Sequence, residues 1–229
     1  MSELNAFDSR SQASETLAGR IAEHLRAGID ARGRASLALS GGSSPVELFE
    51  RLSETELDWS SVTIVATDER WVAPSHEQSN EGMFRRRLLR GRAAAATLVS
   101  LYVDGRTAAG SLSIVTRRLA EMPSPFDAVV LGMGTDGHTA SLFPDAGNID
   151  AMLASRSDCV VPAFDDDRIE RVSLGPTRLL ETRALYLLFF GDDKRAVYDQ
   201  ALGDGPASQW PVRTALHQTR VPTIAYWAP

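Results

Sequence analysis

The sequence is poor in cysteine, in lysine and in long hydrophobic runs. Cys159 is the only cysteine among 229 residues, which excludes an internal disulfide framework and a cysteine-rich metal site and suits a reducing compartment. No apolar run approaches the ~20 residues of a transmembrane helix, and the first residues lack the basic start and apolar core of a secretory signal. We therefore expect a cytoplasmic protein that does not associate with membranes.

Lysine is the second scarce residue type. Lys194 is the only lysine among 24 basic residues, the others being arginine. A genome-wide preference for arginine codons would account for this bias, and so would a need for a compact, mobile amine at this position. The net charge of −6 argues against nucleic acid as a partner, so any positive site for an anionic ligand must be local.

Short apolar runs alternate with segments of helical period, which is typical of an α/β protein with a largely parallel sheet. Leu17, Ile21 and Leu25 recur every four residues and predict an amphipathic helix over 10–31. Four runs are too apolar on both faces for a sheet exposed to solvent and predict buried strands: 35–39, 62–66, 126–132 and 184–190. Weaker strands are expected at 159–163, 170–174 and 222–227, and further helices at 45–53, 78–90, 108–121, 176–182, 193–202 and 208–217.

The stretches that contain glycine and proline, at 73–76, 144–147 and 203–211, are short enough to be loops within one domain. We therefore expect residues 1–229 to form a single α/β domain with a three-layer, Rossmann-like arrangement, in which helices flank a mostly parallel sheet. Ligands of such sheets bind beyond the carboxyl ends of the strands, where the strand order reverses. The loops that follow the four strong strands are the places to search.

The first of these loops is the segment SGGSSP at 40–45. Gly41 and Gly42 let the backbone approach a ligand, Ser44 can cap the next helix, and Pro45 suits its first position. Free N–H groups and the helix dipole at this point favour an anion such as phosphate. An ordinary turn between a strand and a helix remains the alternative, because the segment is neither a dinucleotide fingerprint nor a Walker loop.

The second loop, TDERWV at 67–72, places the ionisable side chains of Asp68, Glu69 and Arg70 at the end of a strand. Such a cluster can hold a polar ligand or can be a solvated charge cluster.

The third loop, GMGTDGHTASLFP at 132–144, carries Asp136 and His138 among three glycines. Imidazole is suited to general-base chemistry near neutral pH, and a neighbouring carboxylate can orient it. We interpret His138 as a candidate catalytic residue, and Met133 and Phe143 as packing residues.

The fourth feature is Lys194 itself, which follows the strand at 184–190 and begins a predicted helix. A cation at a helix N-terminus opposes the dipole, so this position suggests an amine that faces an anionic ligand, the alternative being a solvated surface lysine. The sequence has no G-x-S-x-G nucleophile elbow and no H-E-x-x-H spacing, so we expect neither a serine hydrolase nor a metal site.

Taken together, these segments make the sequence resemble the 6-phosphogluconolactonase family, which shares its fold with glucosamine-6-phosphate deaminases. The similarity extends over nearly the whole chain and is carried by LALSGGSSP, DERWVAPSHEQSN, LGMGTDGHTASLFP, RVSLGPTRLL and LLFFGDDK. It implies hydrolysis of 6-phosphoglucono-δ-lactone to 6-phosphogluconate in the oxidative pentose phosphate pathway, without a metal or other cofactor. The resemblance also implies a small sugar-phosphate substrate, and it favours a monomer.

The resemblance assigns His138 as the base that activates water. Asp136 matches an acidic position of the shared motifs and is the nearest candidate in sequence to orient the imidazole, a role that the sequence leaves open. Arg70 or backbone N–H groups of a glycine-rich loop would stabilise the developing oxyanion. The substrate-binding positions that it implies are Gly41, Gly42, Ser43, Asp68, Arg70, Gly134, Arg171 and Lys194.

Two other functions remain open. The first is a sugar-phosphate isomerase or deaminase on the same fold, which Phe143 disfavours because the deaminases carry a carboxylate at that position. The second is a sugar-phosphate sensor that binds without turnover, which the intact His138 disfavours.

Overall fold

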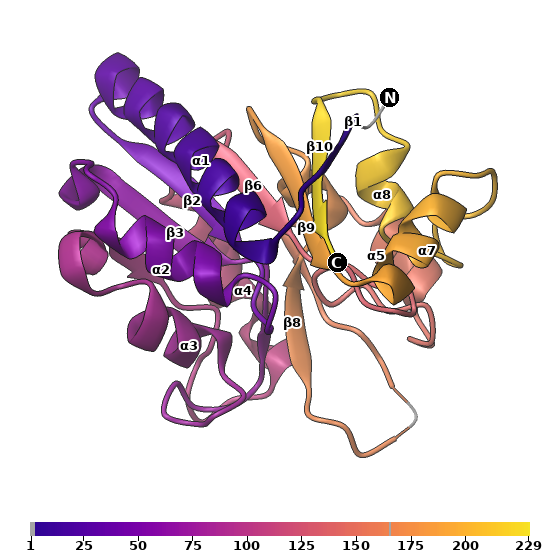
Figure 1. The fold of residues 1–229 in the computed structure, drawn as a ribbon. Helices are drawn as coiled ribbons and strands as arrows, with labels where there is room; N and C mark the ends of the chain where they lie inside the picture. The colour runs from indigo at the N-terminus through magenta and orange to yellow at the C-terminus, as the bar shows by residue number, and fades with distance from the viewer. Residues whose placement is uncertain (1–2, 165) are drawn as a thin grey trace.

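The computed structural model describes residues 3–164 and 166–229 and is built around a seven-stranded sheet (Figure 1). Every pair of neighbouring strands in this sheet is parallel. The strand order is β1 (Glu3–Ala6), β10 (Thr223–Ala228), β9 (Leu185–Phe190), β6 (Ala128–Leu131), β2 (Ala35–Leu39), β3 (Val62–Ala66) and β5 (Thr97–Val99). The predicted fold class, a mostly parallel sheet flanked by helices, is confirmed.

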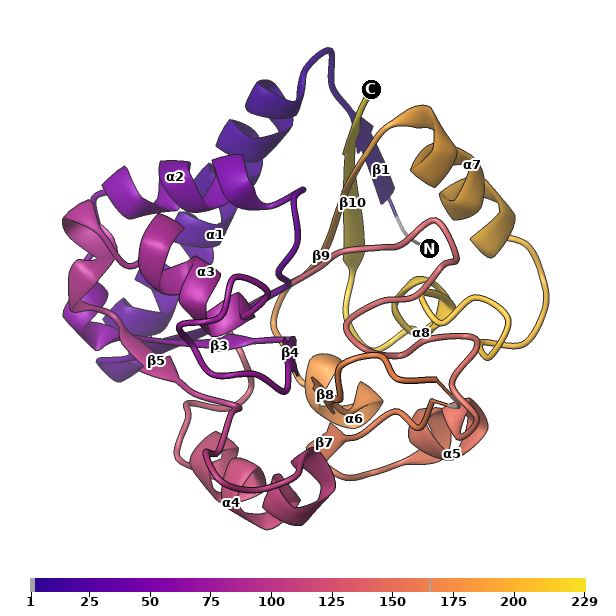
Figure 2. The ribbon, with the colours of Figure 1, turned by 90° about the horizontal axis from the view of Figure 1, so that it is seen from below.

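Helices cover both faces of this sheet, with α1 and α2 on one side and α4 on the other (Figure 2). The longest, α1, turns its apolar side inward, so that Leu17, Ile21 and Leu25 are fully buried, and Ser9 caps its first turn. The helices are α1 (Arg10–Arg32), α2 (Val46–Glu54), α3 (Asn80–Arg87), α4 (Ala108–Ala120), α5 (Ile149–Ala154), α6 (Pro176–Leu179), α7 (Asp192–Ala201) and α8 (Arg213–Leu216), with 3-10 turns at Trp59–Ser61 and Gly91–Ala95.

The four strong strand predictions correspond to β2, β3, β6 and β9, whose residues are almost all buried because helices cover both faces. The weaker candidates form β7 (Cys159–Val160), β8 (Arg171–Leu174) and β10. The short strands β1 and β5 and the helix α5 were not predicted. Both strands lie at the edges of the sheet and have partly exposed residues, so they lack the continuous apolar pattern of the central strands.

The interpretation of residues 67–72 as a loop is wrong in part. Asp68–Arg70 forms strand β4, which pairs antiparallel with β8 in a second, three-stranded sheet of order β4-β8-β7. Thr67 links the two sheets, since its N–H donates to Leu39 of β2 and its carbonyl accepts from Leu174 of β8. The pairing sets Arg70 opposite Arg171, which brings two cations from distant parts of the sequence together.

The strand order reverses between β2 and β6. From β2 the chain continues through β3 to β5 on one side, whereas β6, β9 and β10 follow one another on the other side. The loops after β2 and β6 therefore diverge from neighbouring strands and leave room between them, as expected at a topological switch point.

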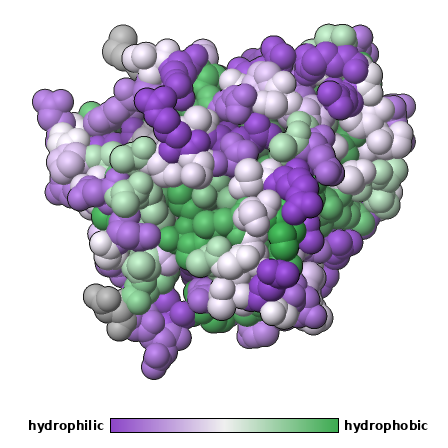
Figure 3. Space-filling view, turned by 180° about the vertical axis from the view of Figure 1, so that it is seen from behind, coloured by the Kyte–Doolittle hydropathy of each residue, from purple (hydrophilic) through white to green (hydrophobic). Residues whose placement is uncertain are grey.

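The surface seen from behind mixes hydrophilic and hydrophobic residues, and hydrophobic ones gather near its centre (Figure 3). Leu202, at 45% exposure, is the only exposed large hydrophobic residue in the described ranges, so this area consists mainly of partly buried side chains. Within the same ranges, no helix combines the length and apolar character needed to cross a membrane.

Candidate active site

A cavity of about 190 Å³ lies at the switch point, beyond the carboxyl ends of β2, β3, β6 and β9. It is smaller than the ~300–1,000 Å³ of typical drug-sized pockets, which suits a small ligand. The structure brings nine of the ten predicted site residues to its lining, and Asp136 lies behind His138 instead. The lining comprises residues 40–44, 132–134, Asp68, Arg70, Asn80, His138, Ala140, Arg171 and Lys194.

His138 and Asp136 form a hydrogen-bonded pair on the loop after β6. Nδ1 of His138 lies 2.6 Å from Oδ1 of Asp136, and the same carboxyl oxygen accepts the backbone N–H of His138. Since Asp136 accepts from Nδ1, the imidazole proton resides on that nitrogen and Nε2 is the basic one. Nε2 has no hydrogen-bond partner in the described part of the chain. His138 can therefore accept a proton at Nε2.

The carboxyl group of Asp136 is tuned by this contact. Burial alone would raise its pKa, but the hydrogen bond and the charge of His138 outweigh burial and bring the pKa of Asp136 below its ordinary value. The carboxylate thus remains ionised at neutral pH and accepts the hydrogen bond from Nδ1 of His138.

Gly134 makes room for this pair. A Cβ atom at position 134 would lie 2.2 Å from Nδ1 of His138 and 2.4 Å from Oδ1 of Asp136, far inside contact distance. The absence of a side chain at Gly134 therefore lets the imidazole and carboxylate meet above the backbone of their own loop.

Asp68 joins three segments of the site and is 6% exposed. Its Oδ2 accepts from Oγ of Ser141 at 2.6 Å and lies 3.9 Å from Nη1 of Arg171. Burial lowers the pKa of Arg171, and the charge of Asp68 acts in the opposite direction. Asp68 therefore stabilises a half-buried cation at the cavity wall and connects it to the loop of His138.

Glu69 anchors the segment between β4 and α3. Its buried carboxylate accepts the N–H groups of Asn80 at 2.7 Å and Glu81 at 2.6 Å, together with the hydroxyl of Ser79. Burial raises the pKa of Glu69, while these backbone hydrogen bonds act to lower it. A carboxylate at the first turn of α3 also faces the positive end of the helix dipole. Glu69 thereby fixes Asn80 at the cavity.

Asn80 is a cavity residue that the sequence interpretation missed. Its Nδ2 donates to the carbonyl of Asp68 at 2.8 Å, and its side chain packs against Gly41 so closely that a Cβ there would lie 1.9 Å from Oδ1. The glycine was expected to let the backbone approach a ligand, and the structure shows that it also admits this amide. The sequence feature that could have identified Asn80 is its position at the end of the block DERWVAPSHEQSN.

The loop after β2 has the free donors expected of an anion site. The backbone N–H groups of Gly41 to Ser44 have no acceptor within the described ranges, and Gly42 adopts a left-handed conformation with φ of 91°. The expected cap is wrong, because α2 begins at Val46 with Pro45 as its N-cap residue and no side-chain capping bond. The hydroxyl of Ser44 is left available at the cavity.

Lys194 lies in the first turn of α7, as predicted, and lines the cavity together with Arg70 of β4 and Arg171 of β8. Burial lowers the pKa of Lys194, the charge of Arg10 lowers it further, and Asp136 acts in the opposite direction. Arg168, by contrast, binds Asp145 and Asp166 and does not line the cavity.

The lining carries three cationic side chains, from Arg70, Arg171 and Lys194, and one carboxylate, from Asp68. This excess of positive charge, with the free N–H groups of residues 41–44, favours an anionic ligand. No group of three histidine, cysteine or acidic side chains arranged to hold a metal ion occurs in residues 3–164 and 166–229.

Comparisons with known proteins match the whole chain. Residues 8–224 match the family described as glucosamine-6-phosphate isomerases/6-phosphogluconolactonase. A 6-phosphogluconolactonase of Rhizobium meliloti is 38% identical over 228 residues, covering 99% of this chain and 98% of that protein. One from Pseudomonas aeruginosa is 37% identical, with 99% and 94% covered. The crystal structure of a 6-phosphogluconolactonase from Shewanella baltica superposes with a TM-score of 0.96 at 38% identity, covering 100% and 98% of the two chains.

Proposed function

Because the chain belongs to the family of glucosamine-6-phosphate isomerases and 6-phosphogluconolactonases, we propose that it hydrolyses 6-phosphoglucono-δ-lactone to 6-phosphogluconate. The observation that carries this proposal is the His138–Asp136 pair, whose unpartnered Nε2 belongs to a ring at the lining of a cationic cavity. The reaction is the lactone-opening step of the oxidative pentose phosphate pathway.

General-base catalysis by His138 suits this substrate. Nε2 takes a proton from a water molecule while the water oxygen bonds to the lactone carbonyl carbon and the carbonyl electron pair moves onto its oxygen. When the tetrahedral intermediate collapses, the bond between this carbon and the ring oxygen breaks, and His138 returns the proton to that oxygen. The carboxylic acid product then ionises. Asp136 stabilises the transient imidazolium through the 2.6 Å contact at Nδ1.

The cationic lining supplies the remaining interactions. Arg70 and the backbone N–H groups of a glycine-rich loop are the two candidate donors for the oxyanion. Donors that are fixed in place before the reaction begins stabilise such a charge most. Lys194, Arg171 and the N–H groups of residues 41–44 are suited to the phosphate. Binding the phosphate, which lies away from the reacting carbon, orients the lactone for attack.

The test is lactone hydrolysis by the purified chain at a pH where spontaneous opening is slow. We expect acceleration by the unchanged protein and a loss of about 10²–10⁴-fold in His138→Ala, the usual contribution of a general base. His24→Ala is the matched control, since His24 lies on α1 outside the cavity lining. Near-normal turnover by folded His138→Ala would reject this base.

The same preparation tests the other two functions. Release of ammonia from glucosamine 6-phosphate would indicate the deaminase. Tight binding of 6-phosphogluconate without acceleration of lactone opening would indicate the sensor. We also propose that residues 1–229 form one domain and that the protein is a cytoplasmic monomer. Light scattering would test the oligomeric state against the monomer mass of 24.8 kDa.

A further inference from the structure

Phe143 has a contact that core packing does not explain. Its ring stacks on the imidazole of His138, with the two centroids 4.2 Å apart and the planes at 30°. The side chain is only partly buried, and the sequence alone indicated a packing residue. The flat apolar ring of Phe143 thus covers one face of His138, the proposed base, which lies five residues earlier on the same loop.

The orientation of the imidazole needs such a contact. Rotation of a histidine ring about χ2 is only weakly restricted by the side chain itself, so neighbours must select the angle. The hydrogen bond to Asp136 fixes the position of Nδ1 but permits the ring to tilt about the line between Nδ1 and Oδ1. A stacked phenyl ring restricts that tilt, because tilting would break face-to-face contact.

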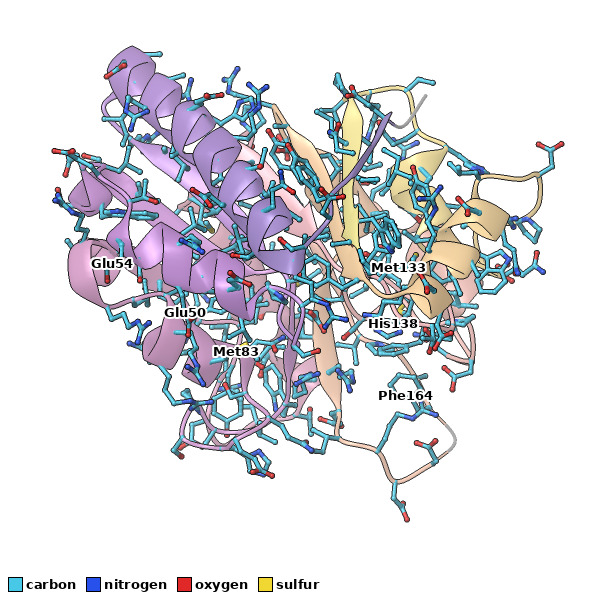
Figure 4. All side chains as sticks on the ribbon, viewed as in Figure 1. Glu50, Glu54, Met83, Met133, His138 and Phe164 are labelled. Atoms are coloured by element: carbon cyan, nitrogen blue, oxygen red, sulfur yellow. The ribbon has the colours of Figure 1, made fainter. Side chains whose placement is uncertain are left out.

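Phe143 is itself held from other sides. Phe164, on the segment between β7 and β8, meets it edge to face at 5.5 Å and 72°, and the guanidinium of Arg171 lies 5.1 Å from its centroid. The guanidinium of Arg168 lies over Phe164 in turn, at 4.1 Å. Figure 4 shows His138 and Phe164 on the same half of the molecule, with Phe164 on this segment. The phenyl ring therefore has little freedom to follow the imidazole.

We propose that Phe143 is a positioning residue for His138, holding the imidazole at the tilt in which Nδ1 meets Asp136 and Nε2 is presented to the cavity. The role rests on the proposed lactonase function. It also has an electrostatic part, because the face of a phenyl ring is negative and attracts the imidazolium that forms during proton transfer. Both effects concern the chemical step, whereas the contact of the ring with Arg171, a proposed phosphate ligand, concerns binding.

The decisive variant is Phe143→Leu, which keeps an apolar side chain but removes the flat ring. We expect kcat to fall about tenfold, because misorientation of a catalytic group affects the chemical step, and KM to rise by a smaller factor, because the ring beside Arg171 is also lost. Phe143→Tyr restores a ring and should recover kcat to within about twofold. Phe7→Leu is the matched control, because Phe7 is a partly buried residue stacked on Tyr226 at 5.5 Å and lies outside the cavity lining.

A spectroscopic measurement tests the stacking without depending on activity. Ring protons above a phenyl face resonate upfield, so the His138 ring signals, assigned with His138→Gln, should be shifted in the unchanged protein and should lose this shift in Phe143→Leu. Unshifted signals in the unchanged protein would overturn the proposal even if the leucine variant fails to fold. An unaltered kcat in folded Phe143→Leu, or a tyrosine variant as slow as the leucine variant, would also overturn it.

Failure of the proposed function has a different signature. If the unchanged protein does not open the lactone, the function is wrong, whereas shifted His138 signals would still support the stacked geometry. An active protein with unshifted signals would retain the function and remove the role of Phe143.

Discussion

Replacing Asp136 by asparagine tests the proposed base through its partner. The amide keeps the size of the carboxyl group, and its oxygen can still accept from Nδ1 of His138, but the negative charge is lost. Because that charge stabilises the imidazolium formed during proton transfer, Asp136→Asn should lower kcat. The groups proposed to bind the phosphate are not substituted, and Asp136 acts on one of them, Lys194, only through its charge, so KM should change less than kcat.

The structure sets the size of this effect. A hydrogen bond to a charged group contributes about 1.5–3 kcal/mol when well buried. The side chain of Asp136 is 45% exposed, so solvent screens the interaction and we expect about 1–2 kcal/mol. Since about 1.4 kcal/mol corresponds to a factor of ten, kcat should fall roughly 5- to 30-fold. Buried catalytic triads lose about 10⁴-fold on the equivalent change, a loss too large for a half-exposed pair.

Steady-state lactone hydrolysis at neutral pH measures the loss, with Asp150→Asn as the control because Asp150 is an exposed aspartate on α5, outside the cavity lining. An unchanged kcat would show that Asp136 does not assist His138. A loss beyond about 10³-fold would also refute the reasoning, because it exceeds what a screened hydrogen bond can supply and would require the carboxylate to take a direct part.

Substitutions of Lys194, Gly41 and Asn80 also test the cavity. Lys194→Arg keeps the charge but replaces a compact amine by a planar guanidinium, so we expect kcat/KM to fall about tenfold. Unchanged kinetics would mean that the site does not require a lysine at this position. Lys194→Met should abolish efficient turnover yet raise the Tm at pH 7. Burial lowers the pKa of Lys194 in the folded state, so the unfolded chain binds the proton more tightly and the charged amine opposes folding at neutral pH. This gain in Tm should shrink as the pH rises through the alkaline range, which calorimetry at several pH values measures. Gly41→Ala should lower kcat/KM, since the added Cβ would lie 1.9 Å from Oδ1 of Asn80, whereas Gly19→Ala, with nothing within 4 Å, should leave activity intact and stabilise α1. Combining Gly41→Ala with Asn80→Ala should cost less than the sum of the two changes, because both act on one contact.

The central strands could be predicted because ASLAL and VTIVA are apolar at four of five positions, a pattern that is typical of a sheet covered on both faces. The strand at Asp68–Arg70 could not, because charged residues are typical of loops. It forms because β8 offers a pairing edge and because Glu69 finds backbone N–H partners at the start of α3. Strand β8 and the start of α3 both lie too far from Asp68–Arg70 in the sequence for a local pattern to indicate these contacts.

The candidate site could be located from sequence because parallel strands bring their carboxyl ends to one edge of the sheet, which gathers the loops after β2, β6 and β9. What remained hidden were contacts between those loops. Ser141 binds Asp68 across 73 positions of sequence, and Asn80 packs against Gly41. The hydroxyl of Ser141 has no feature that marks it until its partner is known, and the only sign of Asn80 was its place at the end of the block DERWVAPSHEQSN.

The residues at this site also depart from the rules that favour a stable fold. Lys194 places a cation at a helix N-terminus and in a half-buried position, where both the dipole and desolvation oppose its charge. Phe143 leaves part of an apolar ring exposed to cover His138. An anionic substrate would offset the unfavourable charge of Lys194, and the stacked ring gives His138 a defined orientation. Lys194 lines the cavity and Phe143 contacts His138, which also lines it, so ligand binding explains both departures, whereas arginine-biased codon usage explains neither the position of Lys194 nor the contact of Phe143.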